Sequence, residues 1–437
     1  MTGAEAAVAG LAALVALLAA GLPVGLAMLL VGTVGTPLFT GSSAMVLASL
    51  KTLTYDTFSS YGLSVVPLFL LMGQFAARSD LAERLFRSAN ALVGNRRGGI
   101  AMSAIGACAG FGAVCGSSLA TAATMTRIAL PEMRRLGCGE TLASGSLAAG
   151  GTLGVLIPPS VVLVVYAILA EENIATLFVA AILPGLLAVA FYLVTVAVVA
   201  RLSSDGGAAD ATAAPGRRAA LLAAWPVVLI FLVMIGGIVA GLFTPTEGAA
   251  VGALATLAFA AARGLDRQAL VESIVETAVS TAMIFFVVLG AASLKTFLAL
   301  TRMPDLAAGW IAGSGLGPWS VLALVLLFYL LLGCLMESLS MILLTVPILL
   351  PVILGLDFGL APGETSIWFG ILVLVVVEVG LVTPPVGLNL FVIRSLAPDL
   401  ALGTIYRGVA PFLVADLVRI VLLAAFRAIS LALVGML

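Results

Sequence analysis

The stretch GFGAVCGSSLATAATM, residues 110–125, places three glycines and two adjacent serines inside one of the most apolar regions of the chain. It carries no charge, and residues of these types are typical of tight turns. Arginine-rich segments lie on both sides of it, at 78–97 and 127–135. Because an arginine excess marks the cytoplasmic side of a membrane protein, both flanks are predicted to lie on that side. We therefore predict that residues 98–126 form a re-entrant helical hairpin with the glycines and serines at its tip.

The composition indicates a membrane protein. Of the 437 residues, 62% are hydrophobic and 9% are charged, whereas soluble domains carry about 25% charged residues. A helical span needs roughly 20 apolar residues, and runs without any charge occur at 6–50, 57–77, 98–126, 141–170, 175–200, 219–246 and 306–336. These runs predict about ten to twelve apolar crossings or re-entrant pieces, of which 6–50 has room for two. Strands of alternating polarity are absent, so we expect an all-α polytopic membrane protein.

A second apolar stretch, at 305–357, is also interrupted in its middle, by Met336-Glu337-Ser338. The connections that flank it lack an arginine excess, which predicts an external position for both. This stretch therefore predicts a second re-entrant hairpin, which enters from the opposite side of the membrane.

Each predicted hairpin is followed by a helix that a double proline interrupts. The two segments are GTLGVLIPPSVVLVVYAI (151–168) and EVGLVTPPVGLNLFVI (378–393). Proline removes a backbone donor and clashes with the preceding turn, so two in succession should break a helix. We expect two discontinuous helices. The alternative, in which the prolines only kink their helices and nearby serines bond the backbone of their own turn, stays open.

Three short motifs recur in the same order, and each second copy follows the first by 221 to 226 residues: GAVCGS (112–117) and GCLMES (333–338), PVGLA (23–27) and PTEGA (245–249), GVLIPP (154–159) and GLVTPP (380–385). Repeats whose hairpins enter from opposite sides indicate the inverted-repeat plan of many secondary transporters. Residues 201–218, rich in alanine, glycine and serine, are predicted to link the two halves. The expected regions are scaffold helices at 1–97, a first transport half at 98–172, the linker with scaffold helices of the second repeat at 173–300, a second transport half at 301–400 and a C-terminal helix at 401–437.

The pairing of a polar tip with a broken helix predicts an ion site in each half. Carbonyls freed by a helix break and serine or threonine hydroxyls are hard oxygen ligands, and half-helix N-termini favour an anionic group. In the first half the tip at Gly116, Ser117 and Ser118 should face Pro158, Pro159 and Ser160. In the second, Glu337 and Ser338 should face Thr383, Pro384, Pro385, Gly387 and Asn389. Among these residues the candidate Na⁺ ligands are Gly116, Ser117, Ser118, Pro158, Pro159, Ser338, Thr383, Pro384 and Pro385, and the candidate substrate residues are Ser160, Glu337, Gly387 and Asn389.

The charged residues inside apolar segments differ in what they predict. A buried carboxylate is costly without a partner, which favours a functional role for Glu337 at the second tip. Glu247 follows Thr-Pro and is predicted to be an ordinary first-turn acid stabilised by the helix dipole. Glu378 stays undecided. Lys51 and Lys295, the only lysines, should reach toward a membrane interface.

Several classes of protein are excluded by what the chain lacks. It has no histidine, which removes a Ser-His pair and a histidine metal site, and its four cysteines match no zinc or redox spacing. A net charge of −1 gives no basic surface for nucleic acid. An intramembrane serine hydrolase is a distant alternative, because neither lysine lies near the Gly-Ser-Ser motif in sequence. We therefore expect no enzyme and no transition metal. The opening residues MTGAEAAVAG lack the positive region of a secretory signal and should lead directly into the first helix.

Four segments together resemble the large membrane subunit of tripartite ATP-independent periplasmic (TRAP) transporters, over essentially the whole chain. They are GAVCGSSLATAATM (112–125), PPS (158–160), FTPTEGAAVGA (243–253) and LVTPPVGLNLFVI (381–393). The resemblance implies a sodium-coupled importer of the bacterial inner membrane that works by an elevator mechanism. It places Na⁺ sites near Ser117, Ser118 and the first proline pair, and near Ser338 and the second.

The resemblance also implies two separate partners, a small four-helix membrane subunit and a soluble periplasmic binding protein that delivers an organic acid, a small carboxylate. Relatives commonly carry serine where this chain has Cys115, and a thiol is a poor ligand for a hard ion. A stand-alone sodium–carboxylate symporter of related architecture is the alternative, because it would need no binding protein.

Overall fold

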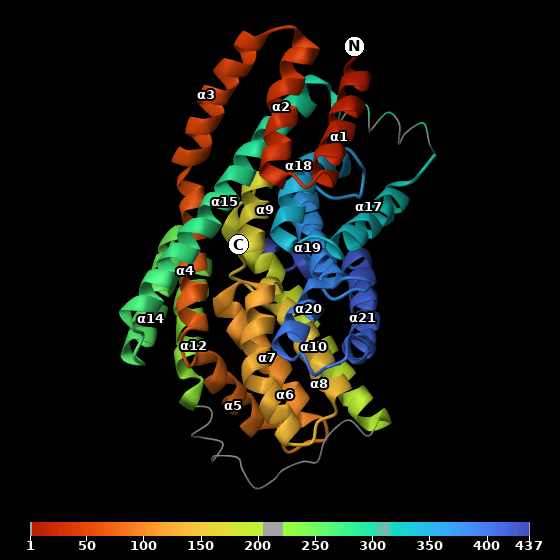
Figure 1. The fold of residues 1–437 in the computed structure, drawn as a ribbon. Coiled ribbons are helices and arrows are strands. Elements are labelled where there is room, and N and C mark those ends of the chain that lie inside the picture. The colour runs from red at the N-terminus through yellow and green to blue at the C-terminus, as the bar shows by residue number, and fades with distance from the viewer. Residues whose placement is uncertain are drawn as a thin grey trace.

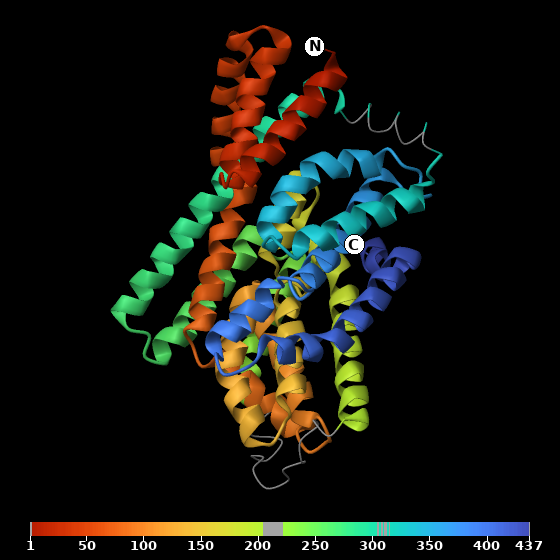
Figure 2. The same ribbon diagram turned by 45° about the vertical axis from the view of Figure 1, so that its right-hand side comes forward.

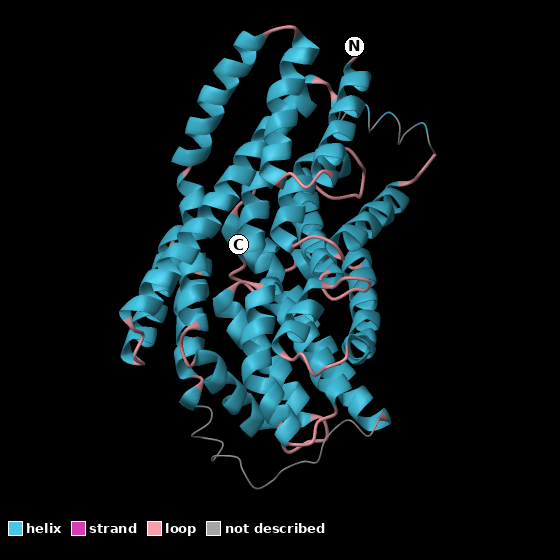
Figure 3. Ribbon diagram, viewed as in Figure 1, coloured by secondary structure: helices cyan, strands magenta, loops and turns pink. Residues whose placement is uncertain are grey.

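A computed structural model describes residues 2–203, 222–303 and 315–436, together with residues 306, 309 and 313. Within these ranges every regular element is a helix, as Figure 3 shows. This confirms the all-α prediction. Most of the predicted linker, from residue 204 to 218, and Asp305 lie outside the described residues.

The helices of the first half run in the order α1 (Gly3–Ala19), α2 (Val24–Thr40), α3 (Ser43–Ser59), α4 (Val65–Ala77), α5 (Leu81–Val93), α6 (Gly99–Cys115), α7 (Ser118–Arg135), α8 (Glu140–Leu156), α9 (Val161–Ala170) and α10 (Ile174–Leu202). Those of the second half are α12 (Trp225–Phe231), α13 (Gly237–Val239), α14 (Pro245–Ala262), α15 (Arg267–Leu300), α17 (Pro318–Gly333), α18 (Ser338–Leu354), α19 (Pro362–Gly380), α20 (Leu388–Leu396), α21 (Leu402–Ala425) and α22 (Ala428–Leu431).

The apolar helices among the described residues fall into three groups. Five are long and apolar enough to cross a membrane, two further bent pairs qualify as broken spans, and six shorter apolar helices accompany them. The count of about ten to twelve pieces was slightly too low. The run 6–50, which was given room for two helices, holds α1, α2 and the start of α3, because helices of 17 residues need less chain than a full span.

The two hairpins approach the middle of the molecule from opposite ends. Figure 1 shows α6 and α7 in its lower half and α17 and α18 in its upper half, and the rotated view of Figure 2 preserves this arrangement. Both hairpins and both discontinuous helices are present, with α8 and α9 bent by 43° at the first break. The element order from α6 to α10 recurs from α17 to α21, which confirms the predicted repeat.

Helices α2, α4, α14 and α15 lie together along one side of the molecule (Figures 1 and 2). Small residues let two of them approach closely: a Cβ added at Gly32 would collide with the backbone of Ser293, and one added at Gly290 would collide with Gly25. Close approach through small residues is a common way to pack helices in a membrane. These helices belong to the regions predicted as scaffold.

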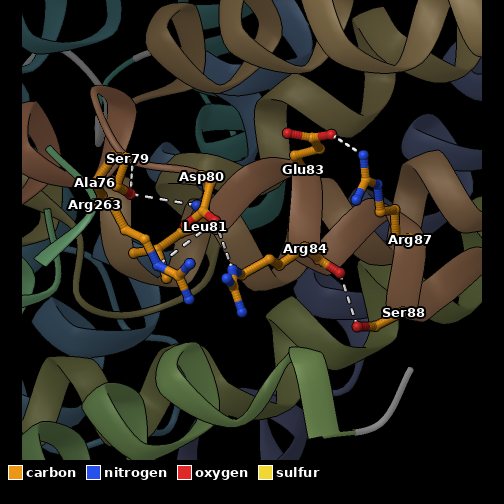
Figure 4. Close-up of polar contacts among 9 residues, drawn as sticks. All are labelled: Ala76, Ser79, Asp80, Leu81, Glu83, Arg84, Arg87, Ser88 and Arg263. Carbon is orange, nitrogen blue, oxygen red and sulfur yellow. Dashed lines mark hydrogen bonds and ion pairs between the residues drawn. The ribbon is translucent and has the colours of Figure 1, made fainter. Parts of the chain in front are cut away.

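The arginine-rich segment 78–97 is largely helical. Most of it forms α5, an amphipathic helix whose apolar face packs on α6. Figure 4 shows that its charges are partly paired: Arg84 Nε lies 2.7 Å from Asp80 Oδ2, and Arg263 reaches the same oxygen at 3.8 Å. Its buried residues Leu81, Leu85 and Phe86 recur at helical spacing, and the helix lies within the region 1–97 where scaffold helices were expected.

Candidate ion and substrate site

The tip of the first hairpin is a turn of two residues between α6 and α7. Gly116 has φ +66°, a left-handed conformation that suits glycine. Ser117 follows as the N-cap of α7, where its hydroxyl accepts a hydrogen bond from the backbone N–H of Ala120 at 3.4 Å. The stretch that interrupts the apolar segment is therefore a sharp reversal of the chain.

The first break separates α8 from α9 over residues 157–160. It contains a cis peptide bond between Pro158 and Pro159, and both prolines are buried. Ser160 then caps α9 by accepting from the N–H of Leu163 at 3.3 Å. Ser117 and Ser160 therefore each bond the backbone of their own helical turn. This is the alternative that the sequence analysis left open for serines near the prolines.

The first tip and the first break meet directly. A Cβ added at Gly116 would lie 3.1 Å from the carbonyl oxygen of Pro159. In the part of the chain that the structure describes, no donor is hydrogen-bonded to the carbonyl oxygens of Pro158 or Pro159. Buried carbonyls normally have a partner, so these oxygens are available to a ligand that supplies positive charge.

The second tip is longer and ends in an acidic cap. Residues 334–337 connect α17 to α18, and Glu337 is the N-cap, whose carboxylate accepts from the backbone N–H of Ser340 at 3.3 Å. The sequence motifs paired Ser117 with Ser338, but in the structure this correspondence is shifted by one residue. Ser117 and Glu337 occupy equivalent positions, because each is the N-cap of its helix. It is Ser118, rather than Ser117, that matches Ser338 as the first residue of its helix.

The second break spans residues 381–387 between α19 and α20. It again contains a cis peptide bond, between Pro384 and Pro385, and Gly387 has φ +64°. Here the carbonyls have partners: the Tyr406 hydroxyl donates to Pro385 at 2.6 Å, and Cys334 Sγ lies 3.7 Å from the Pro384 oxygen. Both prolines are exposed, unlike those of the first break.

Two further polar groups near the second proline pair, a backbone N–H and a hydroxyl, are also hydrogen-bonded within the protein. Asn389 donates its backbone N–H to the carbonyl of Leu381 at 3.1 Å, and the Thr383 hydroxyl donates to the carbonyl of Val379 at 2.6 Å. The second break is therefore closed largely by hydrogen bonds within the protein.

Paired glycines seat each hairpin on its broken helix. A Cβ at Gly112 on α6 would lie 2.5 Å from Cα of Gly154 on α8, and a Cβ at Gly333 on α17 would lie 2.9 Å from Cα of Gly380 on α19. These four glycines are the first residues of two of the three motif pairs that define the repeat. The repeated motifs therefore encode the same close helix contact in both halves.

Four buried polar side chains lie where the two hairpins meet, and one of their hydrogen bonds joins the two halves. The Asn389 amide donates to the Ser118 hydroxyl at 3.1 Å and lies 3.5 Å from the carbonyl oxygen of Ala148. The Ser338 hydroxyl donates to Glu378 Oε1 at 2.7 Å. Asn389 was expected to face the second tip, but its amide crosses to the first because α20 packs on α7. Glu378, undecided from sequence, accepts its hydrogen bond from the first helical residue of α18.

The remaining charged residues lie away from the tips. Glu247 forms a capping box with Thr244 at the start of α14, as its position after Thr-Pro predicted. Lys295 is about half exposed, and its Nζ lies 2.7 Å from Glu171 Oε1. Lys51 is an exposed residue of α3.

The sequence patterns did not reveal one buried network of hydrogen-bonded polar side chains. On α21, Arg419 Nη2 lies 2.6 Å from Asp416 Oδ1, and the Tyr192 hydroxyl of α10 donates to the same carboxylate at 2.9 Å. Tyr192 also lies 3.1 Å from the Thr152 hydroxyl of α8. Acidic and basic residues three apart in an apolar segment were the available signal, since they can pair on one helix face.

The chemistry of the tips is that of hard oxygen atoms. Serine hydroxyls, a carboxylate, an amide and freed carbonyls converge there, and among the described residues no group of three or more histidine, cysteine and acidic side chains is placed to hold a metal. Cys115 ends α6 as a buried residue, with its side chain beside Thr121. Such a set of ligands suits a hard cation better than a metal that prefers nitrogen or sulfur ligands.

The comparisons with known proteins agree on one family. A model of the family described as "Tripartite ATP-independent periplasmic transporter, DctM component" matches residues 11–429. The chain is 37% identical to the C4-dicarboxylate TRAP transporter large permease protein DctM of Pseudomonas aeruginosa, over 88% of this chain and 89% of that protein. It is 31% identical to the sialic acid TRAP transporter large permease protein SiaM of Vibrio cholerae, over 95% and 96% of the two chains.

Two further likenesses concern architecture. The chain is 30% identical to the isethionate TRAP transporter permease protein DctMQ of Oleidesulfovibrio alaskensis, over 79% of this chain but 54% of that longer protein. Among solved structures, the Alcanivorax borkumensis YdaH transporter matches with a TM-score of 0.63 at 15% identity, covering 88% of this chain and 89% of that one. A likeness at this low identity concerns the fold alone.

Proposed function

Since the chain belongs to the DctM component family of TRAP transporters, we propose that it is the large permease subunit of a sodium-coupled importer of a small organic acid. It is a multi-pass membrane transporter subunit and not an enzyme. The proposal adds the coupling ion, the class of substrate, the partners, the elevator movement and the bacterial inner membrane as its location.

The observation that carries sodium coupling is the first break. Two consecutive buried prolines present carbonyl oxygens to which no described donor is bonded, and Gly116 leaves room beside one of them. Na⁺ is a hard cation that carbonyl and hydroxyl oxygens can coordinate, and helix breaks that face one another near the bilayer midplane are a recurring site for it. The hydroxyls of Ser117 and Ser118 lie at the same tip and would complete the set of ligands.

The elevator movement is supported by a loosely packed boundary. A cavity of about 360 Å³ lies between α3 and α15 of the proposed scaffold and α9 and α18 of the proposed transport halves. The exposed ion pair of Lys295 and Glu171 borders it, and an exposed pair contributes little stability. At the other contact, a Cβ on Gly73 of α4 would lie 2.6 Å from the carbonyl oxygen of Cys115, so glycine lets the tip pass close to the scaffold.

The substrate class follows from the relatives and from two helix ends. The relatives' names specify C4-dicarboxylates and sialic acid, which are organic acids. Helices α7 and α18 both begin at the central tips, and helix N-termini attract anionic groups. Ser160, Glu337, Gly387 and Asn389 are the residues we propose for substrate contact.

The proposed partners are a small membrane subunit and a periplasmic binding protein. The family is described as a tripartite periplasmic transporter, and the relative named DctMQ is a longer permease of which this chain spans 54%. A second membrane subunit would cover part of the apolar surface that the scaffold helices expose.

The test is uptake by reconstituted vesicles that contain this chain with its candidate small subunit and binding protein. An inward Na⁺ gradient should drive accumulation of an organic acid, and replacement of Na⁺ by choline should abolish it. Uptake by the chain alone, without either partner, would identify the stand-alone symporter instead. Equal uptake in choline would refute sodium coupling.

A further inference from the structure

We propose that Glu378 and Asn389, with the Ser338 and Ser118 hydroxyls that they contact, form a third Na⁺ site, which joins the two transport halves and shares one serine with each tip-and-break clamp; Asn389 then contacts this ion rather than the substrate. The inference rests on the proposed function, since it adds one coupled ion to a sodium-driven transporter. It uses a buried acid to which the two clamps assign no role.

The four side chains come from four different elements that meet at the centre of the molecule. Ser118 and Ser338 are the first residues of α7 and α18, Glu378 lies in the last turn of α19, and Asn389 lies in the first turn of α20. Their exposed fractions are 3% for Ser118, 2% for Ser338 and 0% for Glu378 and Asn389. The Ser118 side chain contacts the Asn389 amide and also lies beside the Glu378 carboxyl, so the four groups form one continuous cluster.

Two oxygen atoms in this cluster lack a partner. Glu378 Oε2 and Asn389 Oδ1 are buried, and neither accepts a hydrogen bond from any described residue. While Glu378 is ionised, both atoms are acceptors and cannot satisfy each other. A cation held between them would satisfy both at once, and the hydroxyls of Ser118 and Ser338 can add oxygen ligands without giving up their protons.

Glu378 also has no directly bonded counterion among the described residues. No lysine or arginine forms an ion pair with it, and the buried guanidinium of Arg419 is bonded to Asp416 at 2.6 Å. A buried, uncompensated carboxylate is strongly unfavourable, whereas one that coordinates a cation is not. The N-termini of α7 and α18 favour negative charge beside them, whereas the last turn of α19, which carries Glu378, disfavours it, so an ionised Glu378 needs a cation close by.

The consequence is a link between ion binding and the seating of both hairpins. Ser118 comes from the first hairpin and Ser338 from the second, so the site is complete only when both tips are in place. A Na⁺ at this position would therefore hold the two halves together as one body during transport.

The experiment compares Glu378→Gln with Glu364→Gln in the purified chain in lipid nanodiscs, without substrate. Both changes remove one carboxylate from α19, but Glu364 is exposed at the helix start, where glutamine can keep the capping box. Thermal unfolding is measured across NaCl concentrations, with choline chloride holding ionic strength constant. We expect Glu364→Gln to match the unmodified chain, and Glu378→Gln to need at least tenfold more Na⁺ for half of the stabilisation.

A second pair of variants keeps the test decisive if Glu378→Gln fails to fold. Asn389→Ala removes the unpartnered amide oxygen and should weaken the Na⁺ effect at least threefold, whereas Asn389→Asp keeps an oxygen there and should retain it. A Na⁺ dependence of Glu378→Gln equal to that of Glu364→Gln, or equal behaviour of the two Asn389 variants, would overturn the third site.

Vesicle uptake separates this inference from the proposed function. If the unmodified transporter shows no sodium dependence at all, the proposed function fails. If it is sodium-driven and Glu378→Gln lowers the Hill coefficient for Na⁺ by about one, the third site is supported. Uptake driven by a pH gradient in the absence of Na⁺, and lost in Glu378→Gln, would overturn the assignment of Na⁺ and identify a proton site.

Discussion

The two helix breaks carry the same proline pair and end up in opposite states. Pro158 and Pro159 are buried with carbonyls that no described donor contacts, whereas Pro384 and Pro385 are exposed and their carbonyls lie near Cys334 and Tyr406. The proline pair therefore breaks the helix in both halves but does not make an ion site by itself. What makes the difference is which donors the neighbouring elements bring to the freed carbonyls.

The two halves share, in contrast, the glycine contacts between each hairpin and its broken helix, which we call the seams. The first prediction tests them, because Gly112→Ala places a methyl group 2.5 Å from Cα of Gly154 and Gly333→Ala places one 2.9 Å from Cα of Gly380. Such overpacking costs about 1–3 kcal/mol. Both variants should lower the melting temperature in nanodiscs, and the change at Gly112 should be the larger. Gly236→Ala, whose Cβ meets nothing within 4 Å, is the control; losses no larger than in this control would mean that the seams tolerate separation.

The second prediction tests the difference between the tips. Gly116→Ala adds a methyl group 3.1 Å from the Pro159 oxygen, and we expect about a tenfold rise in the Na⁺ concentration for half-maximal uptake, which corresponds to about 1.4 kcal/mol. Gly387→Ala, at a similar φ, meets mainly the flexible Leu390 side chain and should have a smaller effect.

The control for this comparison is Gly137→Ala, at the outer end of the same hairpin. It has φ +71° with nothing near its Cβ, so it carries the backbone strain of about 1–2 kcal/mol without the contact. A rise in the half-maximal Na⁺ concentration as large as that of Gly116→Ala would trace the effect to strain and not to the ion site.

The third prediction concerns the closed state of the second break. Tyr406→Phe removes the hydroxyl that donates to Pro385 at 2.6 Å. It should reduce the free energy of unfolding by about 0.5–1.5 kcal/mol, as expected for one hydrogen bond, while the Na⁺ dependence of uptake stays unchanged. Thermal unfolding and a Na⁺ titration measure both. A marked weakening of the Na⁺ dependence would instead indicate that Tyr406 positions an ion site at the second break, as proposed for the first.

The smallest effect is expected at the outer ends of the hairpins. Arg134 of the first hairpin lies 2.5 Å from Asp399, and its hydrogen bond lowers the pKa of that carboxyl. The contribution of this pair to stability is therefore present above the ordinary pKa of aspartate, about 3.9, and lost as the pH falls through the lowered value. The outer loop of the second hairpin is instead held by Arg427 bonded to the Phe358 carbonyl.

The measurement is the difference in melting temperature between the unmodified chain and Asp399→Asn. It should be small at neutral pH, shrink at high salt because the pair is exposed, and vanish in acid. A difference that grew as the pH fell would contradict the sign of the shift.

Much of the architecture was predictable because its causes are local. Charge-free runs identified the membrane class, proline sterics identified both breaks, and arginine flanks identified the first hairpin. The register of the tips was not predictable: Gly116 reverses the chain within two residues, whereas the second tip uses residues 334–337, which shifted the pairing so that Ser118 matches Ser338.

The sequence by itself determined that this protein is a helical membrane protein with two repeated hairpin-and-break units, because apolar length, proline and glycine act over a few residues. Only the tertiary structure decided that Asn389 reaches Ser118 and that Glu378 accepts from Ser338. It also decided which proline carbonyls stay free. These contacts join residues from distant parts of the chain, and their partners are set by how the two halves pack, which no local pattern encodes.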